Sequence, residues 1–183
     1  KVTVSQQELA KALIAVQPAV GHRATLPILG NVRVKMLAGW ITVSGYNLKQ
    51  AVSQNWAAGL EYEDGAITLP FKVLRDAVKA FPKTALLTIE AVSLDTAKIA
   101  GSETAQTYTI KGMSASEYPA LPEPTSGGPL HVPAQSLRSA LRRTQWASSP
   151  GEHREAFTGV LLDFTDKDGP HVAATDTYRL VVC

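Results

Sequence analysis

One twelve-residue pattern occurs three times in this chain, and this repeat constrains the fold more than any other feature. The pattern covers residues 2–13 and aligns without a gap on residues 67–78 and on residues 130–141. The three starts are 65 and 63 residues apart. Self-similarity at a nearly fixed spacing is typical of chains built from copies of one supersecondary unit. We therefore expect three copies of one unit and expect the function to lie in what the copies form together.

Each copy predicts a strand, then a helix, then further strands. A β-prone triplet opens the copy at residues 2–4, 67–69 or 130–132, and a helix-start residue follows it. Serine is a favoured N-cap and proline suits the first helical turn. Apolar residues at helical spacing and several strand-like runs come next. The predicted unit is β-α-β-β-β, with its later strands at 29–36, 40–44 and 49–57, at 85–91, 96–100 and 106–110, and at 157–164, 171–175 and 179 onward.

Two units are needed to make one closed domain, because a single short helix cannot cover the sheet of its own unit. This predicts an α+β fold with helices on one face and antiparallel sheets on the other. Residues 1–118 supply a first domain of two copies, 1–65 and 66–118. Residues 119–129 are rich in proline and glycine and predict a linker. Residues 130–183 then supply one copy only, the first half of a second domain.

The composition excludes several classes of protein. The chain is 45% apolar and 19% charged, which is typical of a soluble globular protein. Its apolar runs fall far short of the roughly 20 residues that cross a bilayer, and no signal-like segment opens it, so we expect a cytoplasmic protein without membrane contact. Cys183, the only cysteine, forms no intrachain disulfide. Motifs for catalysis, cofactors or metals are missing, so we expect no enzyme, no cofactor and no metal site.

Positive charge gathers in the three helix windows, which hold seven basic and two acidic residues although the net charge of the chain is only +2. Helical spacing places Lys72, Arg75 and Lys79 on one face, and Arg138 and Arg142 on another. Such a face is either a solvated surface or a site for phosphates, and its recurrence in two copies keeps both readings open. Because no aromatic residues are interleaved, phosphate contact here would be independent of base sequence.

A His-Arg pair follows the first and third helices and raises the same two alternatives. The pairs are His22–Arg23 and His153–Arg154, each in a polar loop at the same place in its copy. They either extend the basic surface or keep an exposed loop soluble.

Four motifs in register give the chain a likeness to a known family. They are RATLPILGN at 23–31, GAITLP at 65–70, EYP at 117–119 and ATDTYRL at 174–180. With the threefold repeat, they make the chain resemble the bacterial sliding clamp, the β subunit of DNA polymerase III, over its whole length. The resemblance implies a clamp fold whose domains form a ring by self-association, encircle double-stranded DNA and tether polymerase. Family clamps have three such domains per chain and close as dimers.

The resemblance also implies roles for individual residues. It implies DNA contact for Arg23, Lys72, Arg75, Lys79, Arg138 and Arg142. From the His-Arg loops we add His22 and Arg154 to these candidate DNA-binding residues. The resemblance also implies a pocket for peptides of DNA polymerase and the clamp loader, lined by Phe157, Thr175, Thr177, Tyr178, Arg179 and Leu180. Two departures bear on this pocket: Thr177–Tyr178 replaces the usual Gly-His, and the other wall lies in sequence that this chain does not contain. The resemblance places Tyr108 and Ile110 at the subunit interface, and the alternative is that they only pack within an outer strand.

The odd number of copies leaves alternatives open. The chain is either the N-terminal portion of a full clamp or a short clamp-like protein, and in the second case four chains of three copies would complete a ring. A regulatory or decoy protein that binds clamp partners without encircling DNA is a further alternative.

Overall fold

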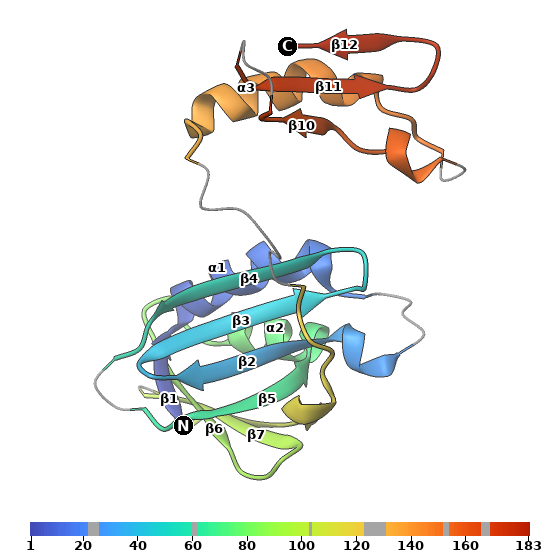
Figure 1. The fold of residues 1–183 in the computed structure, drawn as a ribbon. Coiled ribbons are helices and arrows are strands. Elements are labelled where there is room, and N and C mark those ends of the chain that lie inside the picture. Colours follow the sequence, from blue (N-terminus) through green and yellow to red (C-terminus); the bar gives the residue numbers. More distant parts are fainter. Residues whose placement is uncertain (22–25, 60–61, 103, 123–130, 152–153, 166–168) are drawn as a thin grey trace. The chain divides into compact units, whose positions relative to one another are not determined.

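The computed structural model describes the chain except for residues 22–25, 60–61, 103, 123–130, 152–153 and 166–168. It divides into two compact bodies, an N-terminal body, Lys1–Glu123, and a C-terminal body, Pro124–Cys183 (Figure 1). Most of the predicted linker, from residue 123 on, lies outside the described residues, so its conformation stays a prediction.

The N-terminal body contains two copies of the predicted unit in sequence. The first copy consists of β1 (Val2–Ser5), α1 (Gln6–Val16), β2 (Asn31–Leu37), β3 (Trp40–Tyr46) and β4 (Ala51–Ala57), with 3₁₀ turns at Gln17–Ala19 and Pro27–Gly30. The second consists of β5 (Gly65–Pro70), α2 (Phe71–Ala80), β6 (Leu86–Ala91), β7 (Thr96–Gly101) and β8 (Thr107–Lys111), followed by β9 (Met113–Ser114) and a 3₁₀ turn at Ala115–Glu117. The β-α-β-β-β order is confirmed in both copies.

The start of α1 shows why the predicted helix begins where it does. The Ser5 hydroxyl accepts a hydrogen bond from the Glu8 backbone N–H at 3.2 Å and donates one to the Glu8 carboxylate at 2.8 Å. The side chain thus satisfies a backbone N–H that has no partner within the helix. At α2 and α3 a proline occupies the N-cap position without any side-chain cap.

The two copies exchange their opening strands, which the sequence did not predict. β1 of the first copy pairs with β6 of the second, with Val4 opposite Leu87. β5 of the second copy pairs with β2 of the first, with Ile67 opposite Val34. The result is a five-stranded sheet of order β4-β3-β2-β5-β9 and a four-stranded sheet of order β1-β6-β7-β8. Neither copy can complete its sheet without the other.

Both helices pack against this pair of sheets, α1 on β3 and β4, and α2 on β5 and β8. The buried amide of Gln6 links the copies by donating to the Val78 carbonyl oxygen of α2 at 3.0 Å. The predicted apolar stripes form the core, since all of their residues are buried: Leu9, Ala12, Leu13, Val16, Leu74, Ala77, Val78 and Phe81.

The C-terminal body contains a single copy. It consists of α3 (Ala134–Thr144), 3₁₀ turns at Gln145–Ala147 and Glu155–Phe157, and the three-stranded sheet of β10 (Leu161–Asp163), β11 (His171–Thr175) and β12 (Leu180–Val182). Its apolar stripe, Leu137, Ala140 and Leu141, is only half-buried.

Two sequence predictions about strands are wrong in part. His131 and Val132, in the predicted opening triplet of the third copy, form no strand, and Leu130 lies outside the described residues. The reason is that opening strands pair with the other copy of a domain, and the C-terminal body has one copy. The strands predicted to begin at Leu29 and Phe157 begin later, after 3₁₀ turns.

Candidate nucleic-acid and peptide-binding surfaces

The basic face predicted on α2 is present, but its three cations are not equivalent. Lys72 and Lys79 are exposed and form no ion pair among the described residues. Arg75 is held by its neighbour, because its guanidinium donates to the Asp76 carboxylate from Nε at 3.1 Å and from Nη2 at 3.0 Å. It also lies 5.6 Å from the centre of the Phe71 ring. The charge that α2 offers to a polyanion therefore resides mainly on its two lysines.

The basic face of α3 is stronger. Arg138 and Arg142 are exposed, as is Arg143, and the part of the chain that the structure describes holds no carboxylate paired with any of them. An open hollow of about 490 Å³ is lined by these three arginines together with Gln135 and Ser139. Five donor-bearing side chains without a carboxylate form a surface suited to phosphate oxygens. Arg143 was not among the predicted site residues, although its position beside Arg142 in the last helical turn was a signal.

The loops predicted to add charge are only partly described. His22 and Arg23 lie outside the described residues, so their role stays a prediction. Arg154 is exposed, and its guanidinium lies 6.0 Å from the centre of the Phe157 ring.

An apolar hollow of about 270 Å³ is present where the sequence predicted a peptide pocket. Three of the six predicted residues line it, Phe157, Thr175 and Leu180. The other walls come from residues that the prediction missed: Ala156, Gly159, Leu161, Ala173 and Ala174. Strand alternation could have found two of them, because Leu161 and Ala173 are cross-strand partners on one face of the sheet.

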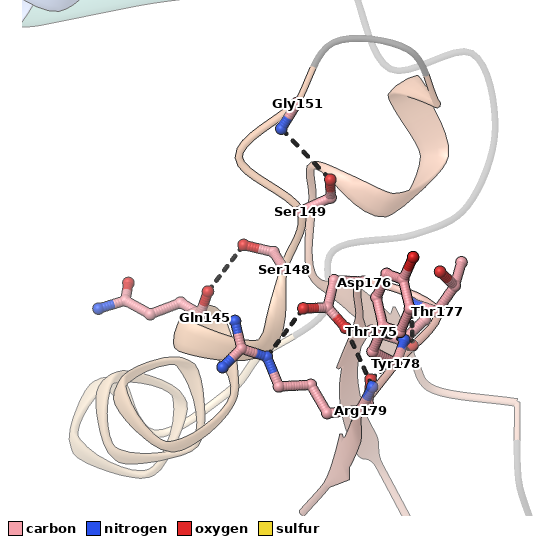
Figure 2. A network of polar contacts seen from close by, with 9 residues as sticks. All are labelled: Gln145, Ser148, Ser149, Gly151, Thr175, Asp176, Thr177, Tyr178 and Arg179. Atoms are coloured by element: carbon pink, nitrogen blue, oxygen red, sulfur yellow. Dashed lines mark hydrogen bonds and ion pairs between the residues drawn. The ribbon is translucent and has the colours of Figure 1, made fainter.

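Thr177, Tyr178 and Arg179 do not line this hollow but form the turn between β11 and β12 (Figure 2). Asp176 organises the turn, accepting hydrogen bonds from the backbone N–H groups of Tyr178 and Arg179, both at 3.0 Å, and from Arg179 Nε at 2.9 Å. Burial opposes ionisation of Asp176, but these hydrogen bonds and the charge of Arg179 outweigh it and lower its pKa. Thr175 adds a hydroxyl that donates to the Arg179 carbonyl oxygen at 2.7 Å.

The two largest side chains of this turn, Tyr178 and Arg179, differ in their contacts. Arg179 lies 5.1 Å from the centre of the Trp146 ring and so ties the turn to the segment after α3. Tyr178 is 97% exposed, in the turn between Thr175 and Leu180, two residues that line the hollow. The Tyr178 side chain is therefore available to meet a bound partner.

The same turn occurs in the first copy, between β3 and β4. Asn47 accepts hydrogen bonds from the backbone N–H groups of Lys49 at 3.0 Å and Gln50 at 2.9 Å. The next residue has a positive φ in both turns, 71° at Leu48 and 80° at Thr177. The turn therefore belongs to the repeated unit, and only its side chains differ between copies.

Tyr108 and Ile110, predicted at a subunit interface, lie on β8 at the edge of the four-stranded sheet. Ile110 is buried in the core, and Tyr108 packs edge-on against Phe81 with 5.5 Å between ring centres. Both side chains thus contribute to packing within the body, whereas the outer backbone edge of β8 has no partner strand among the described residues.

Known proteins share the sequence pattern and the fold of this chain. The family described as DNA polymerase III beta subunit, N-terminal domain, matches residues 1–122. The chain belongs to this family. The Beta sliding clamp of Synechococcus elongatus is 36% identical over 184 residues, covering all of this chain and 48% of that protein. The Beta sliding clamp of Escherichia coli K12 is 27% identical over 183 residues and is covered to 49%.

Solved structures agree with this assignment. The crystal structure of the DNA polymerase III subunit beta from Pseudomonas aeruginosa superposes with a TM-score of 0.90 at 25% identity, over all of this chain and 48% of the other. The expected clamp fold is therefore confirmed. The chain spans about half the length of the curated relatives it matches.

Within this family fold, the EYP motif at 117–119 has a structural role. Tyr118 is buried with Ile28 and Leu29, and the Arg33 guanidinium lies 5.5 Å from the centre of its ring. Burial raises the pKa of Tyr118, and the nearby Arg33 charge only partly offsets this rise. The motif thus fastens the end of the first clamp domain to its five-stranded sheet.

The described part of the chain contains neither a candidate membrane span nor a candidate metal site. None of its helices is both long and apolar enough to span a bilayer. Among the same residues, no group of three His, Cys, Asp or Glu side chains is placed to hold a metal ion.

Proposed function

We propose that this clamp-family chain acts as a processivity factor that encircles duplex DNA and tethers a DNA polymerase to it. The observation that carries the proposal is the basic surface of α3, where Arg138, Arg142 and Arg143 are exposed without a paired carboxylate in the described chain. The exposed lysines of α2 support it, because they occupy the same face of the equivalent helix.

The chemistry of this surface suits a partner that is read by charge rather than by sequence. Arginine and lysine contact phosphate oxygens, which are identical along any duplex. Binding of this kind weakens steeply as salt rises, because counterions released from DNA drive it. A clamp needs such contacts to be weak individually, so that it can slide.

We further propose that the apolar hollow receives short peptides of DNA polymerase and of the clamp loader. Leu161, Leu180 and Phe157 offer apolar surface to a leucine or phenylalanine anchor of the peptide. Tyr178 is 97% exposed in the turn that joins Thr175 to Leu180, and we expect its ring to cover a bound peptide.

Ring formation by self-association, a cytoplasmic location and the domain limits 1–118 and 130–183 belong to the same proposal. The free edge of β8 supports a subunit contact there, since an unpaired edge can continue its sheet into a neighbouring chain. The interface would then use the backbone of β8, with Tyr108 and Ile110 supporting it from within.

Retention on circular DNA tests this function. The chain is incubated with a nicked circular plasmid, separated by gel filtration in moderate salt, and separated again after a restriction enzyme has cut the plasmid. A topologically linked protein stays with the circle and is lost from the linear form. A non-encircling regulator or decoy would bind clamp-binding peptides but leave both DNA forms alike, and that result would refute encirclement.

A further inference from the structure

The arginine on the basic face of α2 has two of its phosphate-binding donors already occupied. Arg75 donates from Nε and from Nη2 to a single oxygen, Oδ1 of Asp76, at 3.1 and 3.0 Å. Such paired N–H donors are the groups with which a guanidinium binds carboxylate or phosphate oxygens. Arg75 therefore cannot offer this edge of its guanidinium to a phosphate while Asp76 holds it.

The ring of Phe71 also holds this guanidinium. The central carbon of the Arg75 guanidinium lies over the ring, 5.6 Å from its centre. The ring is fixed in the core, since Phe71 is 4% exposed, and the face of an aromatic ring attracts a cation. Only 29% of the Arg75 side chain is exposed, so it lies against the helix and does not extend into solvent.

Asp76 holds Arg75 although two lysines lie at pairing distance along the helix. Lys79 follows Asp76 by three residues and Lys72 precedes it by four, the spacings at which helical side chains meet. Among the described residues, however, the cation paired with Asp76 is Arg75. Lys72 and Lys79 stay exposed, and a lysine binds phosphate as a point charge and not through a fork of donors.

The repeat provides an internal comparison for this position. In the gap-free alignment of the three copies, Lys11 of α1 and Ser139 of α3 occupy the position of Asp76. Arg138 of α3, the counterpart of Arg75, is therefore followed by a serine and not by a carboxylate. The acidic residue at this helix position is particular to α2.

We propose that Asp76 is a positioning residue that weakens the binding of α2 to DNA by withholding Arg75 from the phosphates. The inference rests on the proposed contact between α2 and duplex DNA. While Asp76 is in place, α2 contacts phosphates through its lysines alone. Release of Arg75 would add a contact with paired donors, which binds a phosphate more strongly and hinders movement along the duplex. Asp76 thus keeps the α2 contact weak enough for sliding.

Salt titrations of DNA binding test this role. Asp76→Ser gives α2 the residue found in α3 and should steepen the slope of log K against log salt by about 0.9, the value for one added phosphate contact. Between about 50 and 200 mM salt, its binding should then weaken about 3.5-fold more than that of the unmodified chain. Glu90→Ser is the matched control, because it removes the same charge from an exposed position on β6. It should leave the slope unchanged.

A double-variant cycle separates the release of Arg75 from the simple loss of a negative charge. Arg75→Ala alone should hardly change the slope, since Asp76 already withholds this guanidinium. In the Asp76→Ser chain, Arg75→Ala should cancel the gain. Urea denaturation checks that Asp76→Ser stays folded; its midpoint should hardly move, because the Asp76 side chain is 53% exposed and an exposed ion pair adds little stability.

The reciprocal change can be made in α3. Ser139→Asp places a carboxylate directly after Arg138, as Asp76 follows Arg75. It should make the slope shallower by about 0.9, because Arg138 is then withheld from the phosphates.

An unchanged slope in Asp76→Ser would overturn the proposal. An equal gain with and without Arg75 would overturn it as well, since Asp76 would then only repel DNA, and so would an equal gain in Glu90→Ser. Retention on circular DNA is a separate readout. A chain that stays on circles but is insensitive to Asp76→Ser refutes this inference alone, whereas a chain that is not retained in any variant refutes the proposed function.

Discussion

Replacing Arg138, Arg142 and Arg143 with alanine should flatten the salt dependence of DNA binding. All three are exposed and have no paired carboxylate among the described residues, so each can neutralise one phosphate. Each lost contact lowers the slope of log K against log salt by about 0.9, or about 2.7 for the three. Between about 50 and 200 mM salt, binding by the unmodified chain should therefore weaken about 40-fold more than binding by the variant.

Fluorescence anisotropy of a labelled duplex, measured at several salt concentrations, gives these slopes. The matched control replaces Lys49, Lys98 and Lys111, which are exposed residues outside the three helices, and removes the same charge. If net charge alone governs binding, both triple variants will change the slope equally. Equal slopes for the α3 variant and the unmodified chain would refute the assignment of α3 to DNA.

Three further predictions follow from packing, titration and the hollow. Leu74→Ala removes a fully buried side chain and should lower the free energy of unfolding by about 2 to 5 kcal/mol. Leu137→Ala, at the half-buried equivalent position, should lower it clearly less. Urea denaturation measures both losses, and equal losses would contradict the difference in burial. The pKa of Asp176 is lowered in the folded chain, so the ionised carboxylate stabilises the fold above the unfolded pKa of about 4, and this stabilisation is lost as pH falls through the folded pKa. The urea midpoint should therefore drop in that acidic range. A drop of the same size in Asp176→Asn would exclude this carboxylate as the source of the drop. Leu180→Asp should abolish binding of a labelled clamp-binding peptide, whereas Arg179→Lys, outside the hollow, should retain it. Equal losses of peptide binding in the two variants would place the peptide elsewhere.

Local patterns predicted the elements of this fold well. The spacing of Leu9, Leu13 and Val16 indicated α1 because a helix repeats every 3.6 residues, and the same stripe recurred twice. Exchange of β1 and β5 could not be predicted, since Val4 and Leu87 lie far apart in sequence and their pairing leaves no local pattern. The opening strand at 130–132 was predicted from its β-prone residues, but a strand forms only where a partner edge exists.

The candidate surfaces were predicted less completely than the fold. Helical spacing placed Arg138 and Arg142 on one exposed face, as the structure has them. It did not show that Asp76 would bind the guanidinium of Arg75, because adjacent residues on a helix usually point apart. The pocket prediction took Arg179 for a wall, whereas its side chain stacks on Trp146, a contact between segments that no motif reveals.

Site-specific cross-linking shows whether the basic faces of α2 and α3 contact DNA. In a Cys183→Ser background, Arg142→Cys, Lys79→Cys and Lys98→Cys are each combined with duplex DNA that carries a thiol-reactive group on its phosphate backbone. We predict strong cross-linking at positions 79 and 142 and little at position 98, which lies on β7 among the sheet strands. Equal yields at the three positions, or the highest yield at position 98, would mean that these helix faces do not contact DNA.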